Sequence, residues 1–131
     1  MRRLILLLSL FLAAPATAQE VARDWRMAAE YDVLLTSYAI QPKVLHLKAG
    51  EPVRLRFVNN SNEPHRFAAA AFFARAEVPE HLRGLVKHGA VFVAPLSEET
   101  LVLVPKAGRY GVSGGPLAQR LLGMHGRIVV E

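Results

Sequence analysis

Residues 110–130 read YGVSGGPLAQRLLGMHGRIVV, and this stretch determines how the rest of the chain is interpreted. Its beginning, residues 109–113, predicts a short strand, and residues 127–131 predict a closing strand of the same kind. Glycines and a proline interrupt the sequence between these two predicted strands, so we expect residues 117–122 to form a loop or a helical turn. Side chains alternate across a strand, which places Gly114 on the same face as Tyr110.

A second stretch, residues 57–65, reads FVNNSNEPH and follows a strand with strict alternation over residues 53–58. The odd-numbered side chains of that strand are apolar and are expected to face the core. We expect a first strand over residues 32–40. About seven short segments separated by Gly and Pro predict an all-β sandwich. An α+β domain is the alternative, if residues 69–88 are more helical than this reading assumes.

Composition restricts the chemistry that the chain can perform. The sequence has no cysteine, which excludes every function based on a thiolate. Its net charge is +5, and the basic residues are scattered rather than collected in a stripe. This distribution argues against nucleic-acid binding. It favours a solvent-exposed surface that is biased toward an acidic partner.

The first eighteen residues are typical of a secretory signal peptide. Arg2 and Arg3 precede an apolar run, and the small-x-small sequence of residues 16–18 follows it. A retained membrane anchor is the alternative, although the run is short for a span of about 20 residues. We expect a signal peptide at 1–18, a lead-in at 19–30 and one domain at 31–131, located in the periplasm with no transmembrane segment after cleavage.

The two quoted stretches together resemble the metal-binding ends of a cupredoxin, the small copper-carrying β-sandwich. The resemblance covers about residues 40–131 and implies a Greek-key sandwich with a short helix or loop insertion around residues 72–88. The matching residues are Phe57, Asn59, Pro64, His65, Tyr110, Val112, Gly123, Met124, Gly126, Ile128 and Val130.

The resemblance also locates the ligands of a type-1 copper, which needs two imidazoles, a thiolate and a weak axial methionine. His65 and Met124 stand at retained positions, Gly114 stands where the family has its cysteine, and Gln119 stands where the second histidine falls. A shift of one residue would put Ser113 and Ala118 there instead, and neither supplies the ligand. We therefore expect a degenerate copper site and no bound cofactor, with copper as the alternative.

Other candidate residues are weaker. His125 follows Met124 and could join His65 in a copper(I) set, although neighbours in an extended segment point opposite ways. Residues 111–115 match G-x-S-x-G, but that motif marks a nucleophile only at a strand-to-helix elbow. The remaining histidines are expected to face solvent or to be structural; these are His46, His81 and His88.

We therefore expect an exported binding or accessory module and no enzymatic activity. The aromatic pair at residues 72–73 is similar to one in the cupredoxin components found beside bacterial ferrous-iron permeases, which implies a role in metal uptake or respiration. The docking face for a periplasmic or membrane protein would be formed by Leu117, Leu121 and Leu122. The alternative is an electron carrier or ferrous-iron oxidase that holds copper through His65, Met124 and His125; oxidoreductase activity would follow only then.

Overall fold

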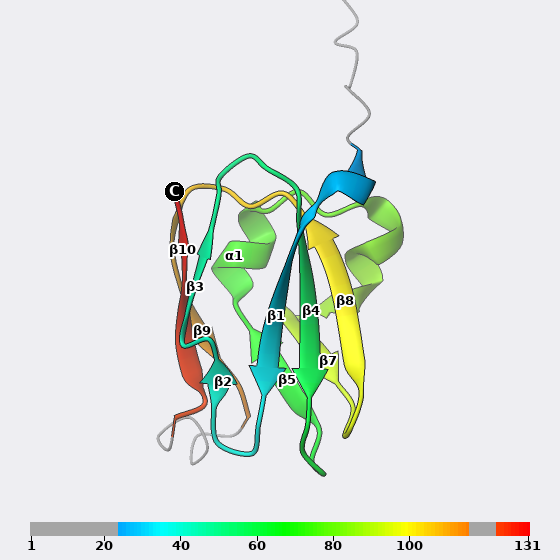
Figure 1. Ribbon diagram of the computed structural model, residues 1–131, viewed down its shortest axis with the longest axis vertical. Helices are drawn as coiled ribbons and strands as arrows, with labels where there is room; N and C mark the ends of the chain where they lie inside the picture. Colours follow the sequence, from blue (N-terminus) through cyan, green and yellow to red (C-terminus); the bar gives the residue numbers. More distant parts are fainter. Residues whose placement is uncertain (1–23, 116–122) are drawn as a thin grey trace, which may run out of the picture.

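The computed structural model describes residues 24–115 and 123–131, which form two β-sheets packed face to face (Figure 1). The strands are β1 (Ala29–Leu35), β2 (Ile40–Gln41), β3 (Val44–Leu47), β4 (Val53–Asn59), β5 (His65–Ala68), β6 (Val86–Lys87), β7 (Ala90–Val93), β8 (Glu98–Leu103), β9 (Gly108–Ser113) and β10 (His125–Val130). The helical elements are the 3-10 helix η1 (Trp25–Met27), the α-helix α1 (Ala70–Arg75) and the 3-10 helix η2 (Glu80–Leu85).

One sheet has four strands in the order β2-β1-β4-β8, and the other has six in the order β3-β10-β9-β5-β7-β6. β1 runs parallel to β4, from Ala29 beside Val53 to Leu35 beside Asn59. β10 lies inside the second sheet, parallel to β3 and antiparallel to β9. The predicted all-β sandwich is confirmed.

The core lies between the sheets and follows from the alternation of the strands. In β4 the side chains of Val53, Leu55 and Phe57 are buried, as the sequence predicts, while the residues between them are partly exposed. The Phe57 ring lies 4.8 Å from the Phe67 ring, centroid to centroid. Burial of such aromatic side chains supplies much of the stability of a small domain.

The helical insertion closes one end of this core. α1 begins directly after β5 and buries Phe72, whose ring centroid lies 5.4 Å from that of Tyr110. η2 follows and packs near β8. The insertion expected around residues 72–88 is therefore present, with its first helix beginning at Ala70.

One local expectation is wrong. The first strand does not continue to residue 40, because the Thr36 amide and hydroxyl both donate to the Ala39 carbonyl and turn the chain after Leu35. Met27, in the lead-in expected at residues 19–30, is exposed. It belongs to a single 3-10 turn with no buried residue, so nothing brings its side chain to the core.

The two ends of the sandwich differ in what they contain. At the lower end in Figure 1 lie the connections of residues 36–39, 60–64 and 94–97, together with the start of β5; we call this the His65 end. At the opposite end, the Tyr110 end, lie α1 and the beginning of β9.

Candidate functional site

Asn59, at the last position of β4, ties three segments together at the His65 end. Its side-chain nitrogen donates to the carbonyl oxygens of Glu63 at 2.8 Å, Val93 at 3.1 Å and Ala94 at 3.1 Å. Its side-chain oxygen accepts from the amide and the hydroxyl of Ser61, at 3.0 and 2.8 Å. A buried amide is stable only when its polar atoms are paired in this way. The network fixes the connection that leads into β5.

His65, the first residue of β5, is only 2% exposed, and neither ring nitrogen has a hydrogen-bond partner in the structure. Burial lowers the pKa of this imidazole, and the nearby charge of Glu63 opposes that effect. The ring is therefore held neutral in a site that offers it no partner among the described residues. An unpaired buried polar atom costs about 1–3 kcal/mol, so such a residue requires an explanation.

Gly114 comes directly after β9 and lies close to the carbonyl oxygen of Arg66, the residue that follows His65. Its amide donates to the Met124 carbonyl at 2.9 Å. A β-carbon at this position would lie 2.9 Å from the carbonyl oxygen of Arg66 and 2.9 Å from the Cε atom of Met124. The methionine could move its flexible end, but the backbone of Arg66 could not yield as easily. The close approach of these backbones, rather than a special φ angle, is what the glycine permits.

Tyr110, Val112 and Gly114 are all buried, which confirms the alternation predicted for this strand. Met124 is fully buried as well, whereas His125, the next residue, is exposed. The structure therefore brings Met124 to Gly114 but turns His125 to the outer face of the sheet.

Four of the predicted site residues, Gln119 and the three leucines of the expected docking face, lie outside the described residues. These leucines are Leu117, Leu121 and Leu122. His46, His81 and His88 are exposed, as expected for solvent-facing side chains. Over residues 24–115 and 123–131, no group of three or more His, Cys, Asp or Glu side chains is arranged to hold a metal ion. Ser113 is the last residue of β9 in the six-stranded sheet.

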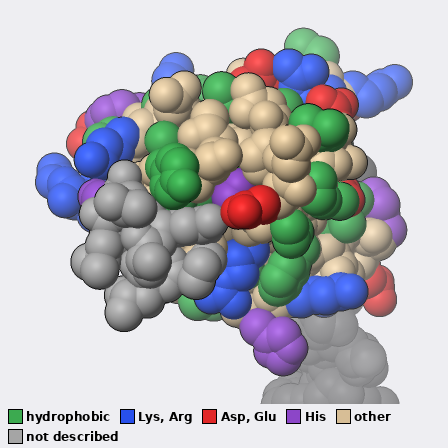
Figure 2. Space-filling view, turned by 90° about the horizontal axis from the view of Figure 1, so that it is seen from below, with side chains coloured by type: hydrophobic (Ala, Val, Ile, Leu, Met, Phe, Trp, Pro, Cys, Tyr) green, Lys and Arg blue, Asp and Glu red, His purple; other side chains and the backbone are tan. Residues whose placement is uncertain are grey.

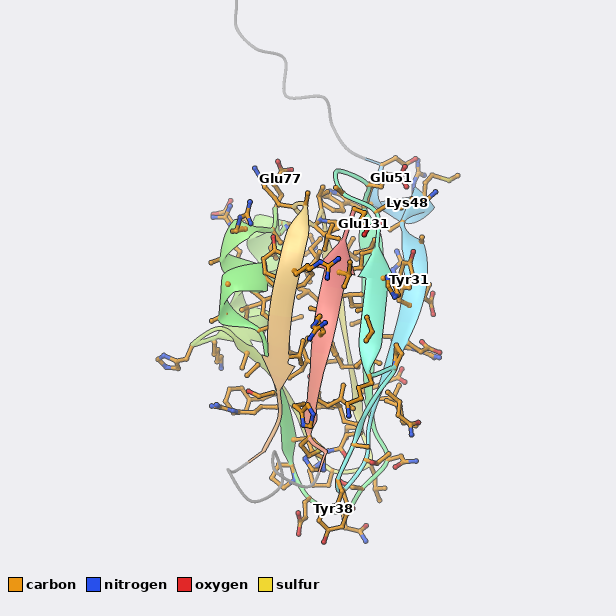
Figure 3. All side chains as sticks on the ribbon, turned by 90° about the vertical axis from the view of Figure 1, so that its left-hand side faces the viewer. Tyr31, Tyr38, Lys48, Glu51, Glu77 and Glu131 are labelled. Carbon is orange, nitrogen blue, oxygen red and sulfur yellow. The ribbon has the colours of Figure 1, made fainter. Side chains whose placement is uncertain are left out.

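Sequence reasoning missed two apolar side chains at the His65 end. Leu96 is 71% exposed and keeps a left-handed φ of 53°, with its amide donating to the Ser61 carbonyl at 3.1 Å. Tyr38 is also exposed, at the tip of the same end (Figure 3). Figure 2 looks onto this end and shows separate apolar side chains among backbone and charged groups. A non-glycine residue with positive φ is uncommon, but no sequence signal distinguishes Leu96 from an ordinary turn residue.

The fold is a Greek-key β-sandwich, and its candidate site lies among the loops at the His65 end. A family model of the cupredoxin-like domain matches residues 3–130, so the chain belongs to the cupredoxin-like family. A search of curated proteins finds no match. Within the part of the chain that the structure describes, no helix has the length and apolar character needed to cross a bilayer.

Two solved structures show the same fold. Auracyanin B is 18% identical with a TM-score of 0.56, and the match covers 79% of this chain and 89% of that one. The dithionite-reduced auracyanin of the photosynthetic bacterium Roseiflexus castenholzii is 14% identical with a TM-score of 0.58, covering 79% and 98%. At these identities the likeness concerns the fold.

The residues present do not fit a type-1 copper. That centre requires a cysteine thiolate, and the sequence contains no cysteine. The unpaired ring nitrogens of His65 could supply one ligand, and the Met124 thioether a second, weaker one. A side chain at position 114 would also require the Arg66 carbonyl or the Met124 methyl group to shift, because a β-carbon there would lie 2.9 Å from each.

Proposed function

We propose that this chain is an exported, cupredoxin-like accessory module that binds a protein partner through the His65 end and has lost the type-1 copper site. The packing around Gly114 is the observation on which the proposal depends. A position that would anchor a thiolate instead lets two backbones approach, with the Met124 methyl group against it. Such packing suits a scaffold used for its surface rather than for a resident metal.

The proposed binding surface includes the exposed apolar side chains of Tyr38 and Leu96, and the proposal adds the three leucines of residues 117–122, which lie outside the described residues. Exposed apolar side chains at one end of a small protein favour contact with a partner. A membrane or periplasmic protein of a metal-uptake or respiratory system is the proposed partner, and export through residues 1–18 would place the module beside it. No catalytic activity of its own is proposed.

A second candidate function is supported by the unpaired nitrogens of His65. A buried imidazole with unpaired nitrogens is suitable for copper(I), which prefers soft and imidazole ligands. In that case the protein would carry copper for electron transfer or iron oxidation. The exposed position of His125 removes one of the three ligands proposed from the sequence.

Metal titration separates the two functions. The purified protein is loaded with copper(I) and then exposed to a chromophoric copper(I) chelator under anaerobic conditions. The accessory module is expected to lose all copper to the chelator, because one imidazole and one thioether form a weak site. Retention with a dissociation constant near or below about 1 μM, together with reversible redox cycling, would contradict it and establish the second function.

Partner binding is tested by capture from solubilised membranes with wild-type protein and Leu121→Asp. Thr100→Asp is the matched control, because it adds the same charge on the exposed face of β8. Loss of a specific partner with Leu121→Asp alone supports docking through the loop of residues 117–122. Equal capture by all three proteins would contradict it.

A further inference from the structure

The two sheets of the sandwich carry opposite charge. The six strands of the six-stranded sheet contain no Asp or Glu, and their Lys and Arg residues are Arg66, Lys87, Arg109 and Arg127. The strands of the four-stranded sheet contain four carboxylates and two arginines, namely Glu30, Asp32, Glu98, Glu99, Arg54 and Arg56. The fold therefore places four of the scattered basic residues on a sheet whose strands carry no carboxylate.

The arginines of the six-stranded sheet stand on its outer face. Arg66, Arg109 and Arg127 are exposed. The residues on either side of each arginine in its strand are buried, apart from two glycines that are partly exposed. Arg127 lies opposite Gly111 in the pairing of β10 with β9, which makes Arg109 its diagonal neighbour at about 7–8 Å. Figure 3 looks onto this face and shows nitrogen-ended side chains across β9 and β10.

Exposed apolar side chains are placed directly beside these arginines. Val44 is 40% exposed and lies opposite Arg127, and Phe92 is 52% exposed and lies opposite Arg66. They are the large apolar residues most exposed on the strands that the structure describes. Arginine and aromatic side chains together are enriched in protein–protein interfaces.

The cations of the two sheets differ in their partners. On the four-stranded sheet, both guanidinium nitrogens Nε and Nη2 of Arg56 donate to the Asp32 carboxylate at 2.7 Å, which lowers the pKa of that carboxyl. None of the ion pairs among the described residues involves an arginine of the six-stranded sheet. Its guanidinium groups are free to bind carboxylates from outside the chain.

We propose that the outer face of the six-stranded sheet is a docking surface for an acidic face of another protein, separate from the His65 end. Planar guanidinium groups match carboxylates in a bidentate geometry, whereas a membrane surface is recognised by charge alone. The sheet is also unsuited to lipid, because a lipid-binding face inserts a continuous apolar surface by about 5–10 Å and this face has isolated apolar residues.

Gly111 provides a clean variant with which to test this surface. A β-carbon there would meet nothing within 4 Å, so Gly111→Glu is accommodated without displacing a neighbour. The new carboxylate would lie opposite Arg127 and beside Arg109 in the strand, where it pairs with the arginines and repels an acidic partner. Thr100→Glu is the matched control, because it adds the same charge beside the already paired Arg56 on the other sheet.

The probe is an oligoglutamate peptide, titrated into the isotopically labelled chain and followed by NMR, with an oligoglutamine peptide as uncharged control. We expect amide shifts in β5, β9, β10 and β3. Binding is expected to weaken by up to about fivefold in Gly111→Glu, since one exposed ion pair contributes up to about that factor. Wild-type affinity is expected for Thr100→Glu. An Arg109→Gln/Arg127→Gln variant repeats the test without a new carboxylate.

Three outcomes would overturn the proposal. Shifts centred on the four-stranded sheet would place the acidic contact elsewhere, and unchanged binding in both the Gly111→Glu and the double variant would exclude the arginines. The third outcome concerns binding to phosphatidylglycerol vesicles, which test for a lipid partner. Vesicle binding that exceeds peptide binding and is unaffected by Arg127→Lys would identify a lipid surface instead, because lysine keeps the charge but not the planar fork.

Discussion

Two buried polar side chains at opposite ends of the sandwich have opposite environments. At one end, Tyr110 is 5% exposed and its hydroxyl donates to the carbonyls of Lys106 at 2.8 Å and Ala107 at 3.3 Å. At the other end, His65 is 2% exposed and neither ring nitrogen has a partner among the described residues. The protein thus pairs a buried polar group at the Tyr110 end and leaves one unpaired at the His65 end, where the unpaired nitrogens cost stability.

The largest expected effect comes from removing the satisfied side chain. Tyr110→Ala deletes a ring that packs on Phe72 and lies under the Arg75 guanidinium, 5.8 Å from the ring centroid. We expect a loss of about 3–5 kcal/mol in the free energy of unfolding, measured with denaturant. Tyr110→Phe keeps the ring and is expected to cost about 1 kcal/mol. A loss below about 1 kcal/mol for the alanine variant would show that this end contributes little.

Gly114→Cys tests whether the His65 end still has room for a ligand. The new β-carbon would approach the Arg66 carbonyl, so we expect a destabilisation of about 1–3 kcal/mol. Gly111→Ala in the same strand is the control and is expected to be tolerated, because its position is open. Equal stabilities of the two variants would contradict the packing described for Gly114.

The same substitution combined with Gln119→His tests the alignment of the lost ligands. With copper(II), a folded double variant is expected to show the thiolate-to-copper absorption that the wild type lacks. A folded but colourless double variant would mean that the assigned register is wrong.

Acid is expected to destabilise the protein through His65. Burial lowers the pKa of its imidazole, so on acidification the unfolded chain, with a pKa near the ordinary value of about 6.5, takes up the proton first. Stability is therefore full above about pH 6.5 and decreases as the pH falls from there toward the lowered pKa of the folded state. Denaturant unfolding at a series of pH values measures this slope, which is expected to be reduced in His65→Leu.

The smallest effect is expected from His65→Leu itself at neutral pH. No partner is left unpaired when this side chain is removed, so the free energy of unfolding is expected to change by less than about 1 kcal/mol, or to increase. Thermal unfolding of wild type and variant at pH 8 measures it. If His65→Leu cost more than Tyr110→Phe, the contrast between the two ends would not hold.

Much of the fold could be predicted from local patterns. The alternation of residues 53–58 and of Tyr110, Val112 and Gly114 predicted the buried faces of two strands, because the period of a strand fixes which side chains turn inward. The limits of the first strand could not be predicted, since they depend on the Thr36–Ala39 turn.

The candidate site was predicted less completely. Sequence patterns located His65, Gly114 and Met124, but the missing partners of the imidazole and the contact of Gly114 with the Arg66 carbonyl require coordinates. The group of arginines on the outer face of the six-stranded sheet could not be predicted, for a different reason. Its arginines are far apart in the sequence, and only the order of strands in the sheet brings them together.

The position of β10 affects how the chain can fold. Residues 125–130 form an interior strand, and β3 pairs with no other strand of its sheet. During synthesis Val44–Leu47 therefore stays unpaired until β10 has been made, and pairing between strands so far apart in the sequence slows folding. If residues 1–18 act as the proposed export signal, this late pairing would keep the six-stranded sheet from being completed before β10 has crossed the membrane.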